Sequence, residues 1–273
     1  MENHSQGTSI LDRIVQARRV SIAHRKRVLP DVPLKMAVEK AAPPRDFAGV
    51  LSRDGLNVIA ELKKASPSRG ILRQDYSPAS LAPALEAAGA AALSVLTEEE
   101  FFLGSLGDLK EVKKVTEIPV LRKDFILDPW QVWEARAAGA DTFLLIVAIL
   151  DDHELGGLMD LGRSLKMEPL VEVHSREELA RALGVGARII GVNNRNLRNF
   201  DVHLETSLDL IEAVPDECIA VSESGLRTHD DLARLRNAGF NAFLVGEQLM
   251  KETDPAARLR NLVGAGRMSH SGA

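Results

Sequence analysis

The sequence predicts an α/β fold, a closed (β/α)₈ barrel with an N-terminal helical extension. Three observations support this prediction: eight short, nearly continuous apolar runs, a helical pattern after each run, and polar residues where several of the runs end. Parallel strands that are buried on both faces give such uninterrupted apolar runs. In a (β/α)₈ barrel, catalytic side chains come from the carboxyl ends of several strands.

The eight predicted strands are residues 57–62, 92–96, 119–122, 141–147, 169–173, 188–193, 218–222 and 242–245, and helical patterns between them include 81–88, 130–138, 177–183, 208–214 and 232–238. Helix starts have capping residues, for example Thr228 with Asp231, Ser175 with Glu178, and the Asp-Pro pairs at 128–129 and 254–255. Ala-Gly pairs at 88–89, 138–139 and 238–239 fit helix ends. No Gly-x-Gly-x-x-Gly turn follows an early strand, which disfavours a doubly wound dinucleotide-binding sheet.

Length and pattern together predict the domain organisation. Residues 1–50 are expected to form a helical extension that caps one end of the barrel, with an amphipathic helix at 10–27 and a proline-containing connection at 29–44. Residues 51–264 are expected to form the catalytic barrel, since single barrels commonly have about 250 residues. Residues 265–273 are small and polar and are expected to form a flexible tail.

Composition disfavours several classes of protein. The net charge is −5 and no basic, aromatic-rich patch is present, so no nucleic-acid partner is expected. No apolar stretch approaches the roughly 20 residues that span a bilayer, and no signal peptide is recognisable. We therefore expect a cytoplasmic protein without a membrane partner. The single cysteine, Cys218, permits no internal disulfide, and the seven histidines lack the spacing of metal ligands, so no metal is expected.

Ionisable residues at the ends of the first and third runs are the first candidates for chemistry. Glu61 and Lys63 alternate along one strand, so their side chains point to the same side. They form either an ion pair at the catalytic rim or a structural salt bridge. Lys123 directly follows the third run, between Leu121 and Phe125. Partial desolvation there is expected to lower its pKa toward useful acid–base chemistry.

Later strand ends add further polar residues. Glu172 lies inside an apolar run, where a carboxylate is difficult to explain as core packing, and His174 follows two residues later as a surface or supporting group. Asn193 and Arg195 end the sixth run. An asparagine can orient a hydroxyl group, and an arginine can bind a carboxylate through two hydrogen bonds.

The loops after the last two strands are candidates for a phosphate site, which this architecture commonly has there. Ser224 and Gly225 end the seventh run, and Gly246 and Glu247 end the eighth. Backbone N–H groups at the two glycines can approach a phosphate closely, and Ser66 can add a hydroxyl. Ordinary strand–helix turns are the alternative explanation for Ser224 and Gly225.

The order of these motifs resembles the indole-3-glycerol phosphate synthase family over about residues 10–263. The motifs are Glu61-x-Lys63-x-x-Ser66-Pro67-Ser68, Leu93-Ser94-Val95-Leu96-Thr97, Arg122-Lys123-Asp124-Phe125, Leu170-Val171-Glu172-Val173, Gly191-Val192-Asn193-Asn194-Arg195 and Ser222-Glu223-Ser224-Gly225. The resemblance implies a carboxy-lyase of tryptophan biosynthesis. Its substrate would be 1-(2-carboxyphenylamino)-1-deoxyribulose 5-phosphate, and its products indole-3-glycerol phosphate, carbon dioxide and water, with no cofactor or metal.

The resemblance also implies roles for single residues. The catalytic set is Glu61, Lys63, Lys123, Glu172, Asn193 and Ser224, and the substrate-binding set is Ser66, Phe102, Phe125, Arg195, Glu223, Gly225, Gly246 and Glu247. Lys123 would be the general acid at the ribulose carbonyl. Glu172 and Glu61 would act in the later steps, with their acid and base roles left open. Arg195 would support charge on the ligand or on Glu172. Some family members have serine in place of Glu247.

Other readings of the sequence remain open. Phe102 and Phe125 form either the walls around the anthranilate ring or ordinary core packing. A phosphoribosylanthranilate isomerase would need a cysteine in its acid–base pair, and Cys218 lies at the start of a strand, the wrong end of a barrel. A tryptophan synthase α subunit and a catalytically silent phosphosugar-binding protein are further alternatives. We expect a phosphorylated small molecule as partner, and a monomer or weak homo-oligomer.

Overall fold

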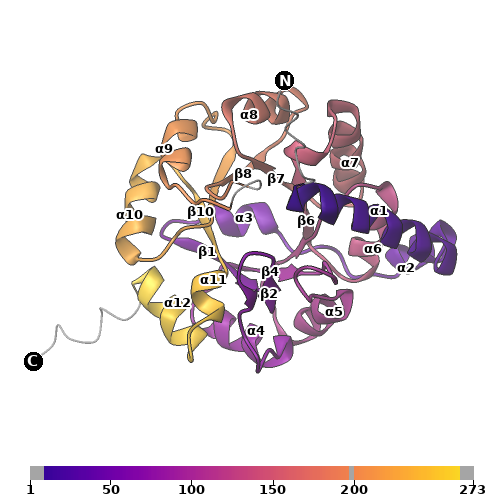
Figure 1. Cartoon of the computed structure of the whole chain (residues 1–273), viewed down its shortest axis with the longest axis horizontal. Coiled ribbons are helices and arrows are strands. Elements are labelled where there is room, and N and C mark those ends of the chain that lie inside the picture. Colours follow the sequence, from indigo (N-terminus) through magenta and orange to yellow (C-terminus); the bar gives the residue numbers. More distant parts are fainter. Residues whose placement is uncertain (1–8, 197–199, 265–273) are drawn as a thin grey trace, which may run out of the picture.

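The computed structural model of the protein describes residues 9–196 and 200–264. Its central feature is a closed barrel of parallel strands, viewed along the barrel axis in Figure 1. The strands are β1 (Asn57–Leu62), β4 (Ala92–Leu96), β5 (Val120–Lys123), β6 (Thr142–Ile146), β7 (Leu170–Val173), β8 (Ile189–Asn193), β9 (Ile219–Glu223) and β10 (Ala242–Val245). Pairing of β1 with both β10 and β4 closes the ring. The predicted barrel is confirmed, and each predicted strand agrees with an observed strand within one residue at either end.

Helices surround the barrel in sequence order. They are α4 (Pro78–Ala87), α5 (Leu106–Val115), α6 (Pro129–Ala137), α7 (Asp152–Ser164), α8 (Arg176–Gly184), α9 (Glu205–Ile211), α10 (His229–Ala238) and α12 (Pro255–Val263), with the short α11 (Glu247–Met250) and a 3₁₀ turn, η1 (Val147–Ile149). The predicted caps are present, since Asp128, Ser175, Thr228 and Asp254 each accept a bond from a backbone N–H of the first turn. The glycines of the Ala-Gly pairs all have positive φ.

Two local predictions were wrong. The connection predicted at 29–44 contains a helix, α2 (Asp31–Glu39), which packs on α6. The predicted helix at 208–214 begins earlier and ends at Ile211. After Ile211 the chain continues in tighter turns, in which the N–H groups of Ala213 and Val214 each donate to the carbonyl three residues before, and Pro215 disfavours helical conformation in the residue before it. A hairpin of β2 (Ala65–Ser66) and β3 (Gly70–Ile71) was not predicted, because strands of two residues are too short to show alternation.

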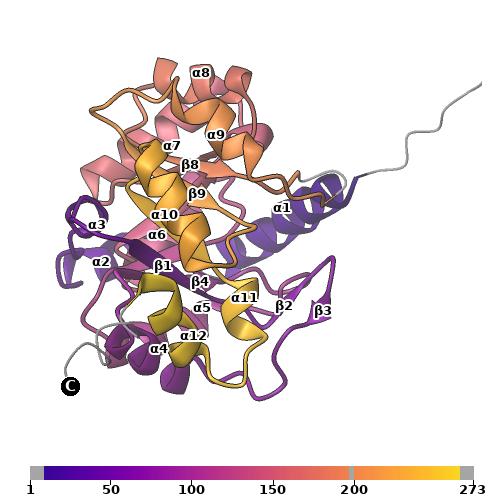
Figure 2. The same ribbon diagram turned by 90° about the vertical axis from the view of Figure 1, so that its left-hand side faces the viewer.

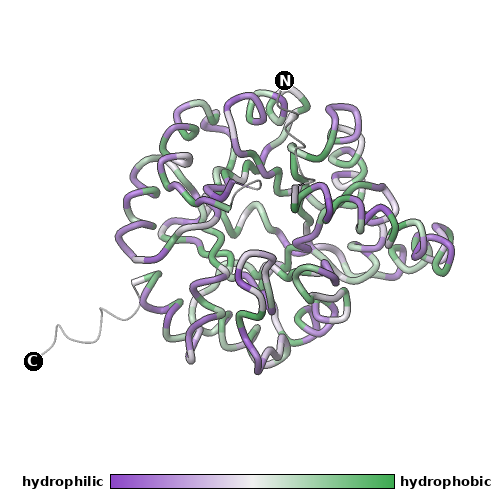
Figure 3. The backbone as a smooth tube through the Cα atoms, viewed as in Figure 1, coloured by the Kyte–Doolittle hydropathy of each residue, from purple (hydrophilic) through white to green (hydrophobic). Residues whose placement is uncertain are grey.

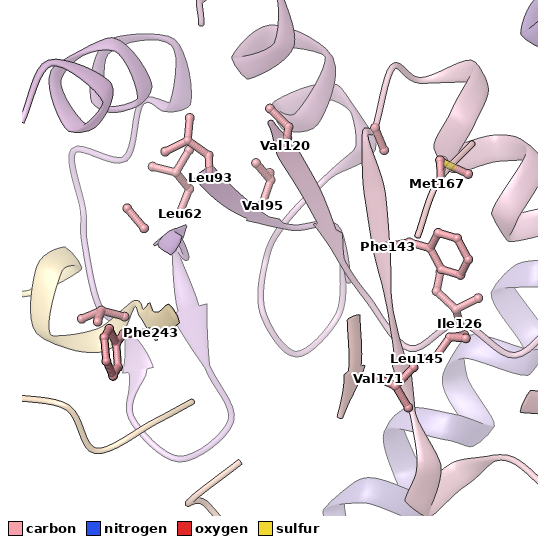
Figure 4. Close-up of a cluster of buried hydrophobic side chains, with 14 of the residues drawn as sticks. Leu62, Leu93, Val95, Val120, Ile126, Phe143, Leu145, Met167, Val171 and Phe243 are labelled. Atoms are coloured by element: carbon pink, nitrogen blue, oxygen red, sulfur yellow. The ribbon is translucent and has the colours of Figure 1, made fainter. Parts of the chain in front are cut away.

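Side-chain alternation divides the apolar core into two layers. Outward-facing residues such as Val58, Leu93 and Phe143 pack against the surrounding helices, and Figure 4 shows part of this layer. Inward-facing residues such as Ile59 and Leu121 fill the barrel. Figure 3 accordingly shows mostly hydrophobic central strands inside helices that alternate in polarity. Both strand faces are therefore mostly apolar, and charged side chains occupy inward positions at the carboxyl ends of several strands.

The N-terminal segment contacts both ends of the barrel. Helix α1 (Ile10–Val28) lies at the end where β2, β3 and α11 also lie, and α3 (Phe47–Leu51) lies at the opposite end (Figure 2). Three buried side chains of α1, Ile14, Arg18 and Ile22, share one helix face because they are four residues apart. None of the described helices is long and apolar enough to cross a membrane. The predicted tail, 265–273, lies outside the described residues.

Candidate active site

A cavity of about 390 Å³ opens at the carboxyl ends of the strands. Its walls come from many elements, including the ends of β1, β5, β7, β8, β9 and β10, the β2–β3 hairpin and α1. This is the end at which enzymes of the same architecture build their active sites. Five of these strands, β1, β5, β7, β8 and β9, present a polar residue at their last inward position, and Gly246 directly follows β10. The cavity therefore has a charged floor and partly apolar walls.

Lys123 lies at the floor of the cavity between two carboxylates. Its Nζ is 2.9 Å from Oε2 of Glu172 and 2.5 Å from Oε2 of Glu223. Burial alone would lower the pKa of Lys123, but Glu172, Glu223 and Glu61 outweigh this effect and raise the pKa above its usual value. The predicted lowering of this pKa is therefore wrong. The sequence did not reveal that three carboxylates from distant strands converge on one ammonium group.

The two carboxylates beside Lys123 differ in charge behaviour. Burial opposes ionisation of Glu172, but Lys123 and His174 outweigh it and hold the pKa of Glu172 well below its usual range. The pKa of Glu223 is raised to about 7, first by burial and then by repulsion from Glu172 and Glu61, which together exceed the attraction of Lys123. Titratable groups with divergent pKa values in one site are typical of acid–base pairs. Glu172 is thus the ionised member and Glu223 the member that holds a proton more readily.

His174 contacts the Glu172 carboxylate on the oxygen that Lys123 does not contact. Its Nε2 is 3.3 Å from Oε1 of Glu172, and its Nδ1 is 3.1 Å from Oε2 of Glu178 on α8. Burial would lower the pKa of His174, but Glu172 and Glu178 raise it to about 10. The imidazolium form therefore predominates at neutral pH and stabilises the negative charge on Glu172.

Glu61 and Lys63 form the ion pair that their alternation predicts. Lys63 Nζ is 2.6 Å from Glu61 Oε1, and only 4% of the Glu61 side chain is exposed. Glu61 also lies against Gly246, where the position of an added Cβ would be 2.3 Å from Glu61 Oε1. Glu61 and Lys63 thus add a second ammonium–carboxylate pair to the cavity that Lys123 and Glu172 line.

Arg195 binds Glu247 rather than Glu172. Its Nη2 donates to Glu247 Oε2 at 3.1 Å, and its backbone N–H donates to the side-chain oxygen of Asn193 at 3.0 Å. Glu247 also accepts from Lys251 at 2.5 Å and has Arg69 at 3.6 Å. Burial opposes ionisation of Glu247, but Lys251, Arg195 and Lys63 outweigh it and lower the pKa of this carboxyl. The expected support of Glu172 by Arg195 is therefore not observed, since His174 occupies that place.

The Ser66 hydroxyl belongs to the part of the cavity wall where a phosphate was predicted. The Ser66 hydroxyl is buried and has no hydrogen-bond partner among the described residues. Ser224 and Gly225, which line the same cavity, both have positive φ, so the chain turns sharply after β9. A buried hydroxyl without a hydrogen-bond partner destabilises the folded protein unless a ligand or a water molecule provides that hydrogen bond. Ser66 is therefore available to a polar ligand group.

Apolar side chains form another part of the wall. The rings of Phe102 and Phe125 are 6.1 Å apart at an interplanar angle of 40°, within the range of favourable aromatic pairs. Ile10, Leu11 and Ile14 of α1 line the cavity together with them. Within the described residues, no group of three or more His, Cys, Asp or Glu side chains is arranged to hold a metal ion.

Comparison with known proteins identifies the family. The sequence profile described as "Indole-3-glycerol phosphate synthase" matches residues 11–262. The chain is 46% identical over 259 residues to the indole-3-glycerol phosphate synthase of Acidithiobacillus ferrooxidans, covering 93% of this chain and 98% of that protein. The chain belongs to the indole-3-glycerol phosphate synthase family. The enzyme of that name from Laribacter hongkongensis is likewise 46% identical over 260 residues, covering 93% of this chain and 99% of that protein.

Solved structures show the same fold at low sequence identity. A 3-hexulose-6-phosphate synthase has a TM-score of 0.61 at 16% identity, covering 77% of this chain and 99% of that chain. A mutant tryptophan synthase α-subunit from Pyrococcus furiosus has a TM-score of 0.59 at 15% identity, covering 76% and 98%. These likenesses show the barrel alone. The relationship to indole-3-glycerol phosphate synthases, in contrast, rests on sequence along nearly the whole chain.

Every residue that the sequence predicted for the site lines this one cavity. Cys218 precedes β9 and so lies at the opposite end of that strand, which does not fit the acid–base pair of an isomerase. Sequence reasoning missed the contribution of α1, because an amphipathic helix shows which face is buried but not what it covers. The predicted site also omitted Arg69. Arg69 is exposed in a loop, and the sequence gives no sign that separates it from an ordinary surface arginine.

Proposed function

We propose that this member of the indole-3-glycerol phosphate synthase family uses the cavity to close the indole ring of 1-(2-carboxyphenylamino)-1-deoxyribulose 5-phosphate. The products would be indole-3-glycerol phosphate, carbon dioxide and water, as a step of tryptophan biosynthesis. The observation that carries this proposal is the Lys123 ammonium held between Glu172 and Glu223 at 2.9 and 2.5 Å, in a cavity that also has an aromatic wall.

Lys123 is the proposed general acid of the first bond-forming step. The ring carbon that bears the carboxylate attacks the ribulose carbonyl carbon, and the carbonyl oxygen must gain a proton. The carboxylates around Lys123 keep its amine protonated, so that it can donate a hydrogen bond and then a proton. Fixed charges in a closed site stabilise the developing alkoxide without solvent reorganisation.

The remaining steps need a base and a second acid. Loss of carbon dioxide restores the benzene ring, after which the hydroxyl leaves with a proton and the adjacent ribulose carbon loses one. Glu172 is ionised and suits the base, whereas the Glu61–Lys63 pair supplies a proton donor to the departing hydroxyl. This arrangement supports assigning the base role to Glu172, a division that the sequence left open.

Substrate placement follows from the other walls. We assign the anthranilate ring to the wall of Phe102 and Phe125, and the phosphate to Ser66 with the backbone N–H groups of Gly225 and Gly246. We assign Asn193 and Ser224 to orientation of the ribulose hydroxyls. Arg195, Glu223 and Glu247 complete the binding surface, with Glu247 holding Arg195 in position.

The wider properties of the protein are part of the same proposal. Residues 1–50 would act as a helical extension that caps the catalytic barrel of residues 51–264, with α1 as part of the cavity wall. We propose a cytoplasmic enzyme that works without cofactor, metal, nucleic acid or membrane, as a monomer or weak homo-oligomer.

The test is turnover of the carboxyphenylamino-deoxyribulose phosphate by purified protein, followed by the rise of indole fluorescence with a metal chelator present. A rise in fluorescence is the expected result. Binding of the substrate without any rise would instead favour a silent phosphosugar-binding protein. Neither binding nor turnover would contradict the proposal and return attention to other phosphate-binding barrels.

A further inference from the structure

Two buried carboxylates of the cavity lie against glycines of neighbouring strands. Glu61 on β1 lies against Gly246, directly after β10, and Glu223 on β9 lies against Gly191 on β8. An ideal Cβ on Gly191 would be 2.2 Å from Glu223 Oε1, far inside van der Waals contact. Gly246 already belongs to the predicted site, but no function has been attached to Gly191.

The backbone does not explain why residue 191 is glycine. Gly191 lies inside β8, and it is absent from the residues with positive φ. A glycine within a strand costs about 0.5–1 kcal/mol relative to alanine, because it loses more conformational freedom on folding. Glycine inside a strand often marks a place that another group approaches closely. Here that group is the carboxylate of Glu223.

The register of the sheet places Gly191 among the strands that carry the charged residues of the cavity floor. Gly191 pairs with Glu172 on β7 and with Val221 on β9. It occupies the inward position between Ile189 and Asn193, both of which face the interior of the barrel or its cavity. The space above Gly191 therefore lies between the strands that carry Glu172 and Glu223.

Glu223 fills that space and reaches Lys123 from it. One carboxylate oxygen, Oε1, rests against Gly191 and has no hydrogen-bond partner among the described residues. The other, Oε2, is 2.5 Å from Lys123 Nζ. Moving Oε1 away from residue 191 would turn the carboxylate and move Oε2 away from the ammonium.

We propose that Gly191 is a positioning residue, whose missing side chain provides the space in which the Glu223 carboxylate binds Lys123 beside Glu172. The effect on turnover rests on the proposed function, whereas the steric relationship does not. A methyl group at 191 must displace either Glu223 or β8. Since β8 is paired along its length with both β7 and β9, the carboxylate moves.

A double-mutant cycle tests this proposal, with Gly191→Ala, Glu223→Ala and the double variant compared with the unsubstituted protein. Misplacing a catalytic group by about 1 Å can cost about 100-fold in rate, so we expect Gly191→Ala to lower kcat/KM by about that factor. If Gly191 acts through Glu223, the double variant should match Glu223→Ala within about twofold, because coupled residues are not additive. Fully multiplicative losses, or near-normal activity of Gly191→Ala, would overturn the proposal.

The same four proteins can also be compared by urea unfolding, which tests the steric claim without any measurement of enzyme activity. Gly191→Ala should lower the unfolding midpoint in the native background and lower it much less with Glu223→Ala, which removes the overlapping carboxylate. If the unsubstituted protein shows no turnover, the proposed function fails while this stability cycle still decides the steric claim. If neither the single nor the double variant folds, the overlap is with another group and the proposal is wrong. Gly157→Ala on α7 is the control, because no atom other than its chain neighbours and the backbone of its own helix lies within 4 Å of a Cβ there.

Discussion

Arg18 and Asp124 form a buried ion pair that joins the N-terminal helix to the barrel. The Arg18 Nη2 is 2.9 Å from Asp124 Oδ2, and the two side chains are 2% and 0% exposed. Asp124 directly follows Lys123 and also accepts from Arg122 at 3.0 Å and from Thr97 at 2.6 Å. Burial opposes ionisation of Asp124, but Arg122 and Arg18 outweigh it and hold its pKa below the usual range. The position of α1 is therefore linked to the residue next to Lys123.

Arg18→Ala should weaken both the fold and substrate binding. Removing one partner of a buried pair typically costs 3–5 kcal/mol, and we expect about 3 kcal/mol because Arg122 still neutralises Asp124. KM should also rise, since α1 carries Ile10, Leu11 and Ile14 into the cavity wall. Urea unfolding and steady-state kinetics measure the two effects. Arg19→Ala, on the exposed face of the same helix, is the control and should change neither.

Lys123→Ala should lower kcat by at least about 100-fold, the range for loss of a general acid. Lys123→Arg separates charge from proton transfer. A guanidinium keeps the positive charge between Glu172 and Glu223 but does not release its proton in a protein. We therefore expect Lys123→Arg to fold more stably than Lys123→Ala and to remain about as inactive. Exposed Lys110→Ala serves as the control, and near-normal turnover in either Lys123 variant would refute the assignment.

The sequence was sufficient for the strands and for the residues at their carboxyl ends. Alternation along the first strand assigns Glu61 and Lys63 to the same side, and Glu172 stands out as a carboxylate inside an apolar run. Closure of the barrel then brings them together, because all eight strands end at the same rim. Local pattern and architecture were enough for this part of the site.

The partners of the charged residues could not be predicted in the same way. Arg195 was expected to support charge on the ligand or on Glu172, and in the structure it binds Glu247. Burial of Lys123 was expected to lower its pKa, but the carboxylates of Glu172 and Glu223 contact the ammonium and raise the pKa instead. Such pairings depend on the conformations that the long side chains of different strands adopt at the rim of the barrel. Alternation specifies the face of a strand on which a side chain lies but not the neighbour toward which it leans.

Ser66→Ala should weaken phosphate binding without weakening the fold. The hydroxyl is buried and has no partner among the described residues, so its removal takes no protein hydrogen bond away. A hydrogen bond to a charged group is worth about 1.5–3 kcal/mol, which corresponds to a rise in KM of about tenfold or more. Inhibition by inorganic phosphate should weaken in parallel. Ser80→Ala on the exposed side of α4 is the control, and an unchanged KM for Ser66→Ala would remove Ser66 from the phosphate site.

His174 should make the protein lose stability as the pH rises above neutral. Its pKa is raised from 6.5 to about 10 by Glu172 and Glu178, against the effect of burial. The folded protein therefore holds this proton more tightly than the unfolded chain. The resulting stabilisation is complete below pH 6.5 and disappears as the pH approaches 10. One proton corresponds to a slope of at most about 1.4 kcal/mol per pH unit in that window.

His174→Gln should remove this slope, and urea unfolding between pH 7.5 and 9.5 measures it. The lower limit avoids Glu223, whose pKa is raised from 4.5 to about 7 and whose effect on stability therefore lies mainly below the window. His153→Gln on the exposed surface of α7 should keep the slope of the unsubstituted protein. An equally steep fall in stability for His174→Gln would show that the imidazolium is not the group responsible. In that case Lys123 alone would stabilise the Glu172 carboxylate.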